Sequence, residues 1–215
     1  MKKEFLIAVF ASLYISTAQT KNDLYNIIDN TSSERIEKDI RKLADFGTRH
    51  TLSDTLSETR GIGAARRWIK KEFESISKDC SECLEVFYQK NYFTPKDGNR
   101  IVKPVWINNV VAIQRGKTHP NRFIIMSGDI DSRISDPTNY TDDSPGANDN
   151  ASGMAGTIEA ARVLSKYSFE NSILYVGLAG EEQGLFGGKG LAKHAQDQGW
   201  EIIGILNNDM IGNIK

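Results

Sequence analysis

Acidic residues follow three strand-like segments of this sequence, and another acidic residue precedes a helix-like segment. These groups are Asp129 with Asp131, Asp149, Glu181 with Glu182, and Asp209. Ligands of parallel sheets bind beyond the carboxyl ends of the strands, so we expect these side chains to converge. Converging carboxylates repel one another unless a cation lies between them, and burying unpaired charge is costly. The pattern therefore predicts a metal site rather than separate solvated charges.

The spacing within the acidic groups indicates their roles. Asp129 and Asp131 are two residues apart and face the same side if the strand continues, whereas the adjacent Glu181 and Glu182 diverge. One glutamate can then bind a metal while its neighbour faces a substrate. A carboxylate beside metal-bound water can act as general base, and the metal polarises a carbonyl. Together these features predict metal-assisted hydrolysis of an amide.

Alternating apolar and amphipathic segments must position these groups. The segments with strand character are 84–94, 105–114, 123–127, 173–178 and 202–206. The segments with helical character are 21–46, 60–77, 151–167 and 186–198. From residue 123 onward, strands alternate with helices. We therefore predict an α/β fold, with a mainly parallel, twisted sheet and helices on both faces.

The first 18 residues have the features of a signal peptide. Lys2 and Lys3 precede an apolar run from Phe5 to Ile15, and small residues follow up to Ala18. The apolar run is too short to span a bilayer, and the alternative is a buried N-terminal helix. We predict cleavage after Ala18 and a secreted or periplasmic protein without a membrane anchor.

The remaining residues, 19–215, are expected to form a single domain. We divide it into an N-terminal helical part (21–78) and a catalytic core (about 84–215). The chain has 215 residues, of which 27 are Lys or Arg and 28 are Asp or Glu, for a formal net charge of −1. A nucleic-acid-binding protein would usually show a basic excess, so nucleic acid is not an expected partner.

The cysteines, Cys80 and Cys83, have C-x-x-C spacing. In an exported protein we expect a local structural disulfide between them. Two buried free thiols, a redox motif or half of a zinc site are the alternatives, but no second Cys or His pair stands at zinc-finger spacing.

The acidic groups lie within four motifs that resemble metallopeptidase family 28, whose members include secreted zinc aminopeptidases. The motifs are Ser127–Arg133, Pro145–Gly153, Gly180–Gly187 and Asn208–Gly212. They occur in the family's order within a region of resemblance of roughly 60–215. The resemblance implies a phosphorylase/hydrolase-like α/β fold and two bound zinc ions.

The resemblance also implies a role for each acidic residue. Asp149 would bridge both metals, while Glu182 would bind one metal and Asp209 the other. Glu181 would be the general base, and Asp131 would orient the first metal ligand. The peptide bond after the bridging aspartate is often cis in this family, so we expect it to be cis here.

Asp129 is a departure from the family, which has His at this position in the pattern His-x-Asp. An aspartate can bind zinc through oxygen, and we include Asp129 among the expected ligands. It is shorter than histidine, adds negative charge and removes the imidazole that Asp131 would orient. Oxygen ligands alone suit Mg, Ca or Mn, so another divalent cation is the alternative to zinc.

A second departure concerns the family's last ligand, a histidine well downstream of the Asp209 motif. This sequence ends at Lys215, and its histidines are His50, His119 and His194. None lies in that motif, and we expect each to be an exposed surface residue. We therefore expect the sequence to correspond to the front portion of the family's domain, without its C-terminal part.

The sequence thus predicts a metal-dependent exopeptidase of the aminopeptidase type, with peptides as substrates. A glutaminyl cyclase-like relative is one alternative, although the Glu181–Glu182 pair favours two-metal hydrolysis. A catalytically impaired or truncated metal-binding pseudoenzyme is another. Asp129 and the missing distal histidine favour it, and the retained Glu181 argues against it. The sequence predicts neither the substrate side chain nor the oligomeric state.

Overall fold

The structure, a computed structural model, describes residues 22–213. The predicted signal peptide, 1–18, lies outside the described residues. The chain divides into two compact units, and the second begins at Ser33. In the first unit, residues 22–29 are helical.

The second unit contains every strand and helix predicted for it from the sequence. In chain order these are α2 (Ser33–Ala44), α3 (Gly61–Asp79), β1 (Leu84–Phe93), β2 (Val105–Gln114), β3 (His119–Asp129), a π-helical turn η1 (Ala147–Ser152), α4 (Gly153–Leu164), β4 (Asn171–Leu178), α5 (Phe186–Asp197) and β5 (Glu201–Asn207). β3 begins before the predicted residue 123, because His119 already pairs with Asn171 of β4 ahead of a register shift.

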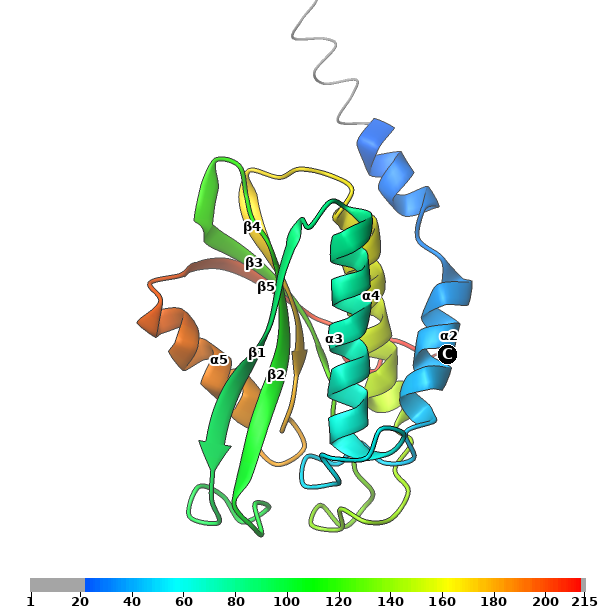
Figure 1. The fold of residues 1–215 in the computed structure, drawn as a ribbon, viewed down its shortest axis with the longest axis vertical. Coiled ribbons are helices and arrows are strands. Elements are labelled where there is room, and N and C mark those ends of the chain that lie inside the picture. The colour runs from blue at the N-terminus through cyan, green and yellow to red at the C-terminus, as the bar shows by residue number, and fades with distance from the viewer. Residues whose placement is uncertain (1–21, 214–215) are drawn as a thin grey trace, which may run out of the picture. The chain divides into compact units, whose positions relative to one another are not determined.

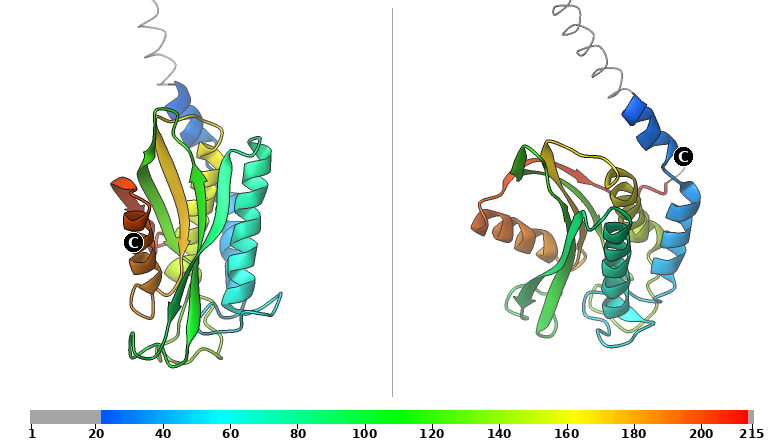
Figure 2. Two further views of the ribbon diagram at one scale, coloured as in Figure 1. Left: turned by 60° about the vertical axis from the view of Figure 1, so that its left-hand side comes forward. Right: turned by 45° about the horizontal axis from the view of Figure 1, so that its top comes forward.

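The five strands form one mixed sheet in the order β1-β2-β4-β3-β5. β4, β3 and β5 are mutually parallel, and β2 joins β4 in antiparallel orientation. β1 pairs with β2 as an antiparallel hairpin at one edge. α3 and α4 cover one face of the sheet and α5 the other (Figures 1 and 2). The predicted α/β fold with helices on both faces is confirmed.

The central strands are buried on both faces because their apolar side chains alternate between two core clusters. In β2, Val110 and Ala112 pack in the cluster that includes α3 and α4, while Val111 and Ile113 pack in the cluster that includes α5. The same alternation occurs in β4. Burying one such side chain stabilises the fold by about 1.5–3 kcal/mol, so these strands anchor the edge that carries the acidic groups.

Helix α3 packs on the sheet through an apolar stripe. Ile62, Ala65, Ile69, Phe73 and Ile76 are all buried and recur every three or four residues. This spacing places them on one face of the helix. The stripe explains why the predicted helix at 60–77 forms in the fold.

Cys80 and Cys83 form a disulfide immediately after α3, with their Cα atoms 5.5 Å apart. Cys80 is the residue that ends the helix. The predicted local disulfide is therefore present, and it lies at the connection from α3 to β1.

The edge strand β5 leaves apolar side chains accessible to solvent. Ile203, Ile205 and Leu206 are 41%, 63% and 56% exposed. Exposed apolar strand edges favour association with other strands. Between residues 22 and 213, no helix combines the length and apolar character needed to cross a membrane.

Candidate functional site

The parallel strands end at one edge of the sheet, and the acidic groups follow these ends. Asp129 is the last residue of β3 and lies in register with the last residue of β4. Glu181 and Glu182 follow β4, and Asp209 follows β5. The structure therefore brings together the three strand ends that the sequence predicted to carry the site.

Asp131 is buried and organises the segment after β4. Its carboxylate accepts hydrogen bonds from the backbone N–H groups of Glu181 (3.2 Å) and Glu182 (3.1 Å). It also accepts one from Thr51 Oγ1 at 2.9 Å. Asp131 thereby fixes the backbone from which both glutamates project.

Asn150 connects the end of β3 with the segment after β5. Its Nδ2 donates to Asp129 Oδ2 and to the carbonyl of Asn208, both at 2.9 Å. Its Oδ1 accepts from the N–H groups of Gly153 (3.0 Å) and Met210 (3.2 Å). Both donor hydrogens and both acceptor lone pairs of the amide are thus engaged. Sequence analysis included this residue in a motif but assigned it no role.

Asp149 lies within η1, directly before α4, and its side chain is exposed. The Asp149–Asn150 peptide bond is cis, as the resemblance implied. Gly146 precedes η1 with φ +46°, and a Cβ there would lie 2.3 Å from the carbonyl oxygen of Asp149. This approach requires glycine at position 146.

Arg49 is a fully buried cation that joins three segments around the site. Its Nε donates to the carbonyl of Ile130 at 2.8 Å. Its Nη1 donates to the carbonyls of Leu43 (2.9 Å) and Pro145 (2.5 Å), and its Nη2 to that of Gly146 (2.8 Å). The guanidinium thus holds the segment between Asp129 and Asp131 against the turn that precedes η1.

The charge of Arg49 also acts on the acidic groups. Burial lowers its pKa to about 10, and the nearby carboxylates of Asp131 and Asp149 oppose that shift. Among the described residues, no ion pair links Arg49 directly to a carboxylate. This role of Arg49 could not be predicted from the sequence, because a lone arginine in a loop gives no local signal of burial.

Three carboxyl groups at this edge have pKa values well above those of free side chains. Burial, followed by repulsion from Asp131, raises the pKa of Asp129 to about 7. Burial raises the pKa of Asp131 to about 6. Burial, then repulsion from Asp131 and Glu182, raises the pKa of Glu181 to about 7. Asp209 and Asp149 also repel Glu181, so carboxylates from several segments act on this residue.

Glu182 and Asp209 differ in their surroundings. The Glu182 carboxylate forms an ion pair with Arg133 Nε at 2.5 Å, and its side chain is 11% exposed. The Asp209 side chain is exposed. The Arg133 guanidinium therefore neutralises one of the predicted metal ligands in this structure.

Two histidines differ from the prediction that all three are exposed. His50 is fully buried, with Nε2 3.0 Å from the carbonyl of Pro137 and Nδ1 accepting from the Leu52 N–H at 3.1 Å. His194 is half-buried and packs edge-on against Trp200. Both predictions were wrong, because tertiary contacts decide the burial of an isolated histidine: those with Pro137 for His50 and with Trp200 for His194.

His119 is exposed, as predicted. It begins β3, where its N–H donates to the carbonyl of Glu170 at 2.8 Å. None of the three histidines therefore joins the acidic groups.

The donor chemistry of this edge fits a divalent cation. It supplies buried and mutually repelling carboxylates. A bound cation would reduce both their repulsion and the cost of burying their charge. The side chains are not assembled for coordination, since within residues 22–213 no three His, Cys, Asp or Glu side chains are grouped so that they could hold a metal ion. Asp129 is bonded to Asn150, and Glu182 is paired with Arg133.

Comparison with known proteins gives the family context of this arrangement. A sequence model described as Peptidase family M28 matches residues 109–215. A probable zinc metalloprotease of Pyrenophora teres f. teres is 41% identical over 193 residues, which is 90% of this chain and 42% of that protein. One of Pyricularia oryzae is 40% identical over 199 residues, which is 93% of this chain and 39% of that protein.

Solved structures of similar fold include LapB and a glutaminyl cyclase. LapB from Legionella pneumophila has a TM-score of 0.67 at 22% identity, covering 86% of this chain and 45% of LapB. A glutaminyl cyclase from Fimbriiglobus ruber has a TM-score of 0.63 at 19% identity, covering 81% of this chain and 60% of the cyclase. At these identities the likeness concerns the fold.

These relatives are longer than this chain, which spans about four tenths of the curated proteins it matches. The matched residues of the family model include every acidic group of the site and all strands from β3 onward. The order of the motifs, the α/β fold and the sequence matches agree, and the chain belongs to peptidase family M28.

Proposed function

We propose that this site carries out metal-dependent hydrolysis of the peptide bond that follows a free N-terminal residue. The observation that carries the proposal is the group of carboxyls at the strand ends. Burial and mutual repulsion raise the pKa values of Asp129 and Glu181 to about 7. Such clusters of perturbed groups are typical of functional sites. The printed names of the curated relatives support a zinc-dependent protease.

Glu181 is the proposed general base. Its raised pKa lets it accept a proton near neutral pH, which is the range in which proton transfer by a side chain is most effective. The hydrogen bond from its backbone N–H to Asp131 fixes its place on the segment after β4. Asp131 is thus a positioning residue for the proposed base.

Asp129, Asp149, Glu182 and Asp209 would hold the metal, which the relatives' names indicate to be zinc. We propose two ions, as the family resemblance implies. A bound divalent cation would supply Lewis acidity for the scissile carbonyl and would make water more acidic. The donor set contains oxygen alone, so a harder cation such as Mn²⁺ is the alternative metal.

A glutaminyl cyclase activity is the second candidate, because cyclases are among the structures of similar fold. The two activities require different substrates, since a cyclase needs an N-terminal glutamine. A metal-binding chain without turnover is a third outcome. Assays of peptide hydrolysis and of cyclisation, run in parallel, separate all three.

We also propose export of the mature chain from residue 19 onward. The Cys80–Cys83 disulfide supports it, since disulfides persist in oxidising compartments. Expression with the natural N-terminus, followed by N-terminal sequencing of the extracellular protein, tests this proposal. Intracellular retention of the intact N-terminus would contradict it.

The hydrolysis proposal is tested with a panel of aminoacyl-anilides in the presence of zinc. We expect turnover that a chelator abolishes, and a loss of at least about 100-fold in kcat in Glu181→Gln, since general bases contribute about 10²–10⁴-fold. Glu170→Gln changes an exposed glutamate outside the site and should leave turnover unchanged. Equal turnover of the Glu181→Gln and original chains would overturn the assignment of the base.

A further inference from the structure

A cavity of about 990 Å³ lies between the segment 52–56, the beginning of α3 and the β1–β2 hairpin. The basic residues that line it are Arg60, Arg66, Lys90 and Lys103. Asp54 is the acidic residue that lines it, and its Oδ1 already accepts from the N–H groups of Leu56 and Ser57. The cavity therefore has an excess of positive charge.

Arg66 is the strongest indication of a ligand. Its side chain is half-buried, and burial lowers its pKa. In the part of the chain that the structure describes, no hydrogen bond or ion pair engages its guanidinium. The neighbouring Arg60 instead pairs with Asp143 at 2.6 Å. The Arg66 guanidinium is therefore available to an anionic group, with which it would form charge-assisted hydrogen bonds.

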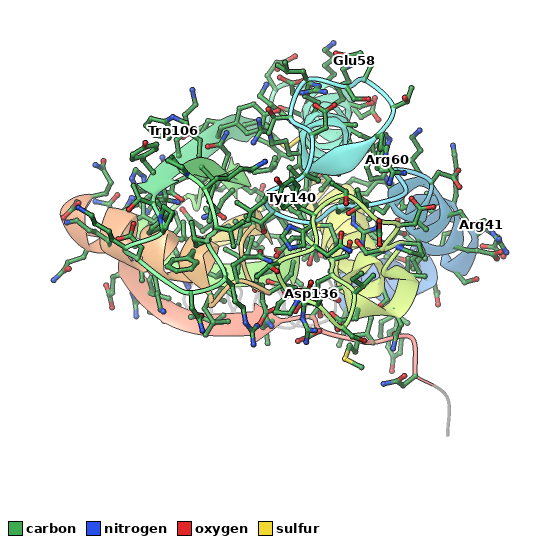
Figure 3. All side chains as sticks on the ribbon, turned by 90° about the horizontal axis from the view of Figure 1, so that it is seen from below. Arg41, Glu58, Arg60, Trp106, Asp136 and Tyr140 are labelled. Carbon is green, nitrogen blue, oxygen red and sulfur yellow. A yellow bond between two sulfur atoms is a disulfide. The ribbon has the colours of Figure 1, made fainter. Side chains whose placement is uncertain are left out.

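The other residues that line the cavity present aromatic rings and polar atoms, which suit an extended polypeptide. Trp106 is 56% exposed, and Tyr140 carries Lys103 Nζ above its ring at 3.9 Å from the centroid. Asn108 Oδ1 is buried without a hydrogen-bond donor among the described residues, and a backbone N–H would satisfy it. In the view of Figure 3, Tyr140 lies between Trp106 and Arg60 on one end of the molecule.

The cavity shares one wall with the candidate site. Thr48, Leu52 and Ser53 line the cavity, while Thr51 between them donates its hydroxyl proton to Asp131. Tyr140 belongs to the segment that connects β3 to η1. Residues 48–53 therefore contact both the cavity and Asp131, so the cavity lies next to the candidate site.

We propose that this cavity binds an acidic segment of the peptide substrate, downstream of the residue that is removed. Arg66 and Lys103 would bind its carboxylates, and Asn108 Oδ1 would accept a backbone N–H from it. Guanidinium and carboxylate form charge-assisted hydrogen bonds, which are the strong ones. The inference rests on the proposed peptidase function for the placement of the substrate.

The test is a binding measurement that requires neither metal nor turnover. Fluorescently labelled, N-acetylated peptides containing Asp-Glu-Asp or the isosteric Asn-Gln-Asn are titrated into the whole chain with a chelator present. We expect the acidic peptide to bind about tenfold more tightly or better, since hydrogen bonds to charged groups are the more stabilising ones. The preference should weaken at high salt.

Three variants assign the preference to the cavity. Arg66→Met and Lys103→Met should each remove most of it, and Lys117→Met, an exposed lysine outside the cavity, should retain it. Circular dichroism tests whether each variant is folded. If Arg66→Met does not fold, the result for Lys103→Met decides.

Equal binding of the two peptides would overturn the proposal, as would a preference unaffected by either cavity variant. Inorganic phosphate that displaces the peptide at an equal concentration would indicate a small-anion site and would also overturn it. Hydrolysis plays no part in this assay. A failure of the acidic-peptide proposal can therefore be distinguished from a failure of the proposed peptidase function.

Discussion

At the scale of single residues, the site consists of acids held in place by neutral and basic partners. Asn150 engages Asp129, and Thr51 engages Asp131. Arg49 adds a buried positive charge beside Asp131. These partners orient the carboxylates, while the repulsion that remains makes the site receptive to a cation.

The charge of Asp129 should destabilise the metal-free chain at high pH. Burial raises its pKa to about 7 in the folded state, far above that of an unfolded aspartate. The contribution of Asp129 to the free energy of unfolding is therefore fully present below the pKa of this residue in the unfolded chain. It is lost as the pH rises through the folded-state pKa of about 7. We expect Asp129→Asn to be more stable than the original chain at pH 8 by on the order of 2 kcal/mol, and the difference to shrink toward pH 5.

Urea denaturation with a chelator present, repeated between pH 5 and 8, measures this difference. Asp136→Asn is the control, because hydrogen bonds from Thr138 lower the pKa of this exposed carboxyl. Its substitution should not stabilise the chain at pH 8. A pH profile of Asp129→Asn that parallels the original chain would contradict the predicted burial of charge.

At the scale of elements, the sheet and its helices could be predicted from sequence because their apolar residues are local and periodic. The alternation in β2 and the stripe on α3 are examples. The π-helical turn η1 and the pairing at His119 could not, since they depend on contacts with distant segments. The burial of His50 and the role of Asn150 have the same origin. The four motifs located the acidic residues but not the partners that hold them.

Arg49 provides a test at this scale, because it joins the end of α2, the segment after β3 and the turn before η1. A lysine keeps the charge but cannot reproduce the guanidinium fork. We expect Arg49→Lys to lower the free energy of unfolding by about 2–4 kcal/mol, as buried acceptors lose their donors. Denaturation by guanidinium chloride measures this change in the free energy of unfolding.

Arg41→Lys is the matched control, since Arg41 is exposed on α2 and pairs with Glu37. Such surface pairs contribute at most about 1 kcal/mol. If Arg49→Lys were as stable as the control, the guanidinium would not be what holds these three segments together.

In the molecule as a whole, acidic groups follow the parallel strands at one edge of an M28-type sheet. The chain spans about four tenths of the curated relatives it matches, and β5 exposes apolar side chains at the sheet edge. The acidic edge and the basic cavity are both contacted by the segment 48–53.

We expect the acidic edge to bind metal, and the metal content of the purified chain provides the test. After dialysis against zinc, elemental analysis should show about two equivalents per chain, the number expected of a two-metal site. Asp149→Asn should lose most of the zinc, whereas Asp197→Asn, an exposed aspartate on α5, should retain it. Zinc content near zero in the original chain, or unchanged in Asp149→Asn, would contradict the account.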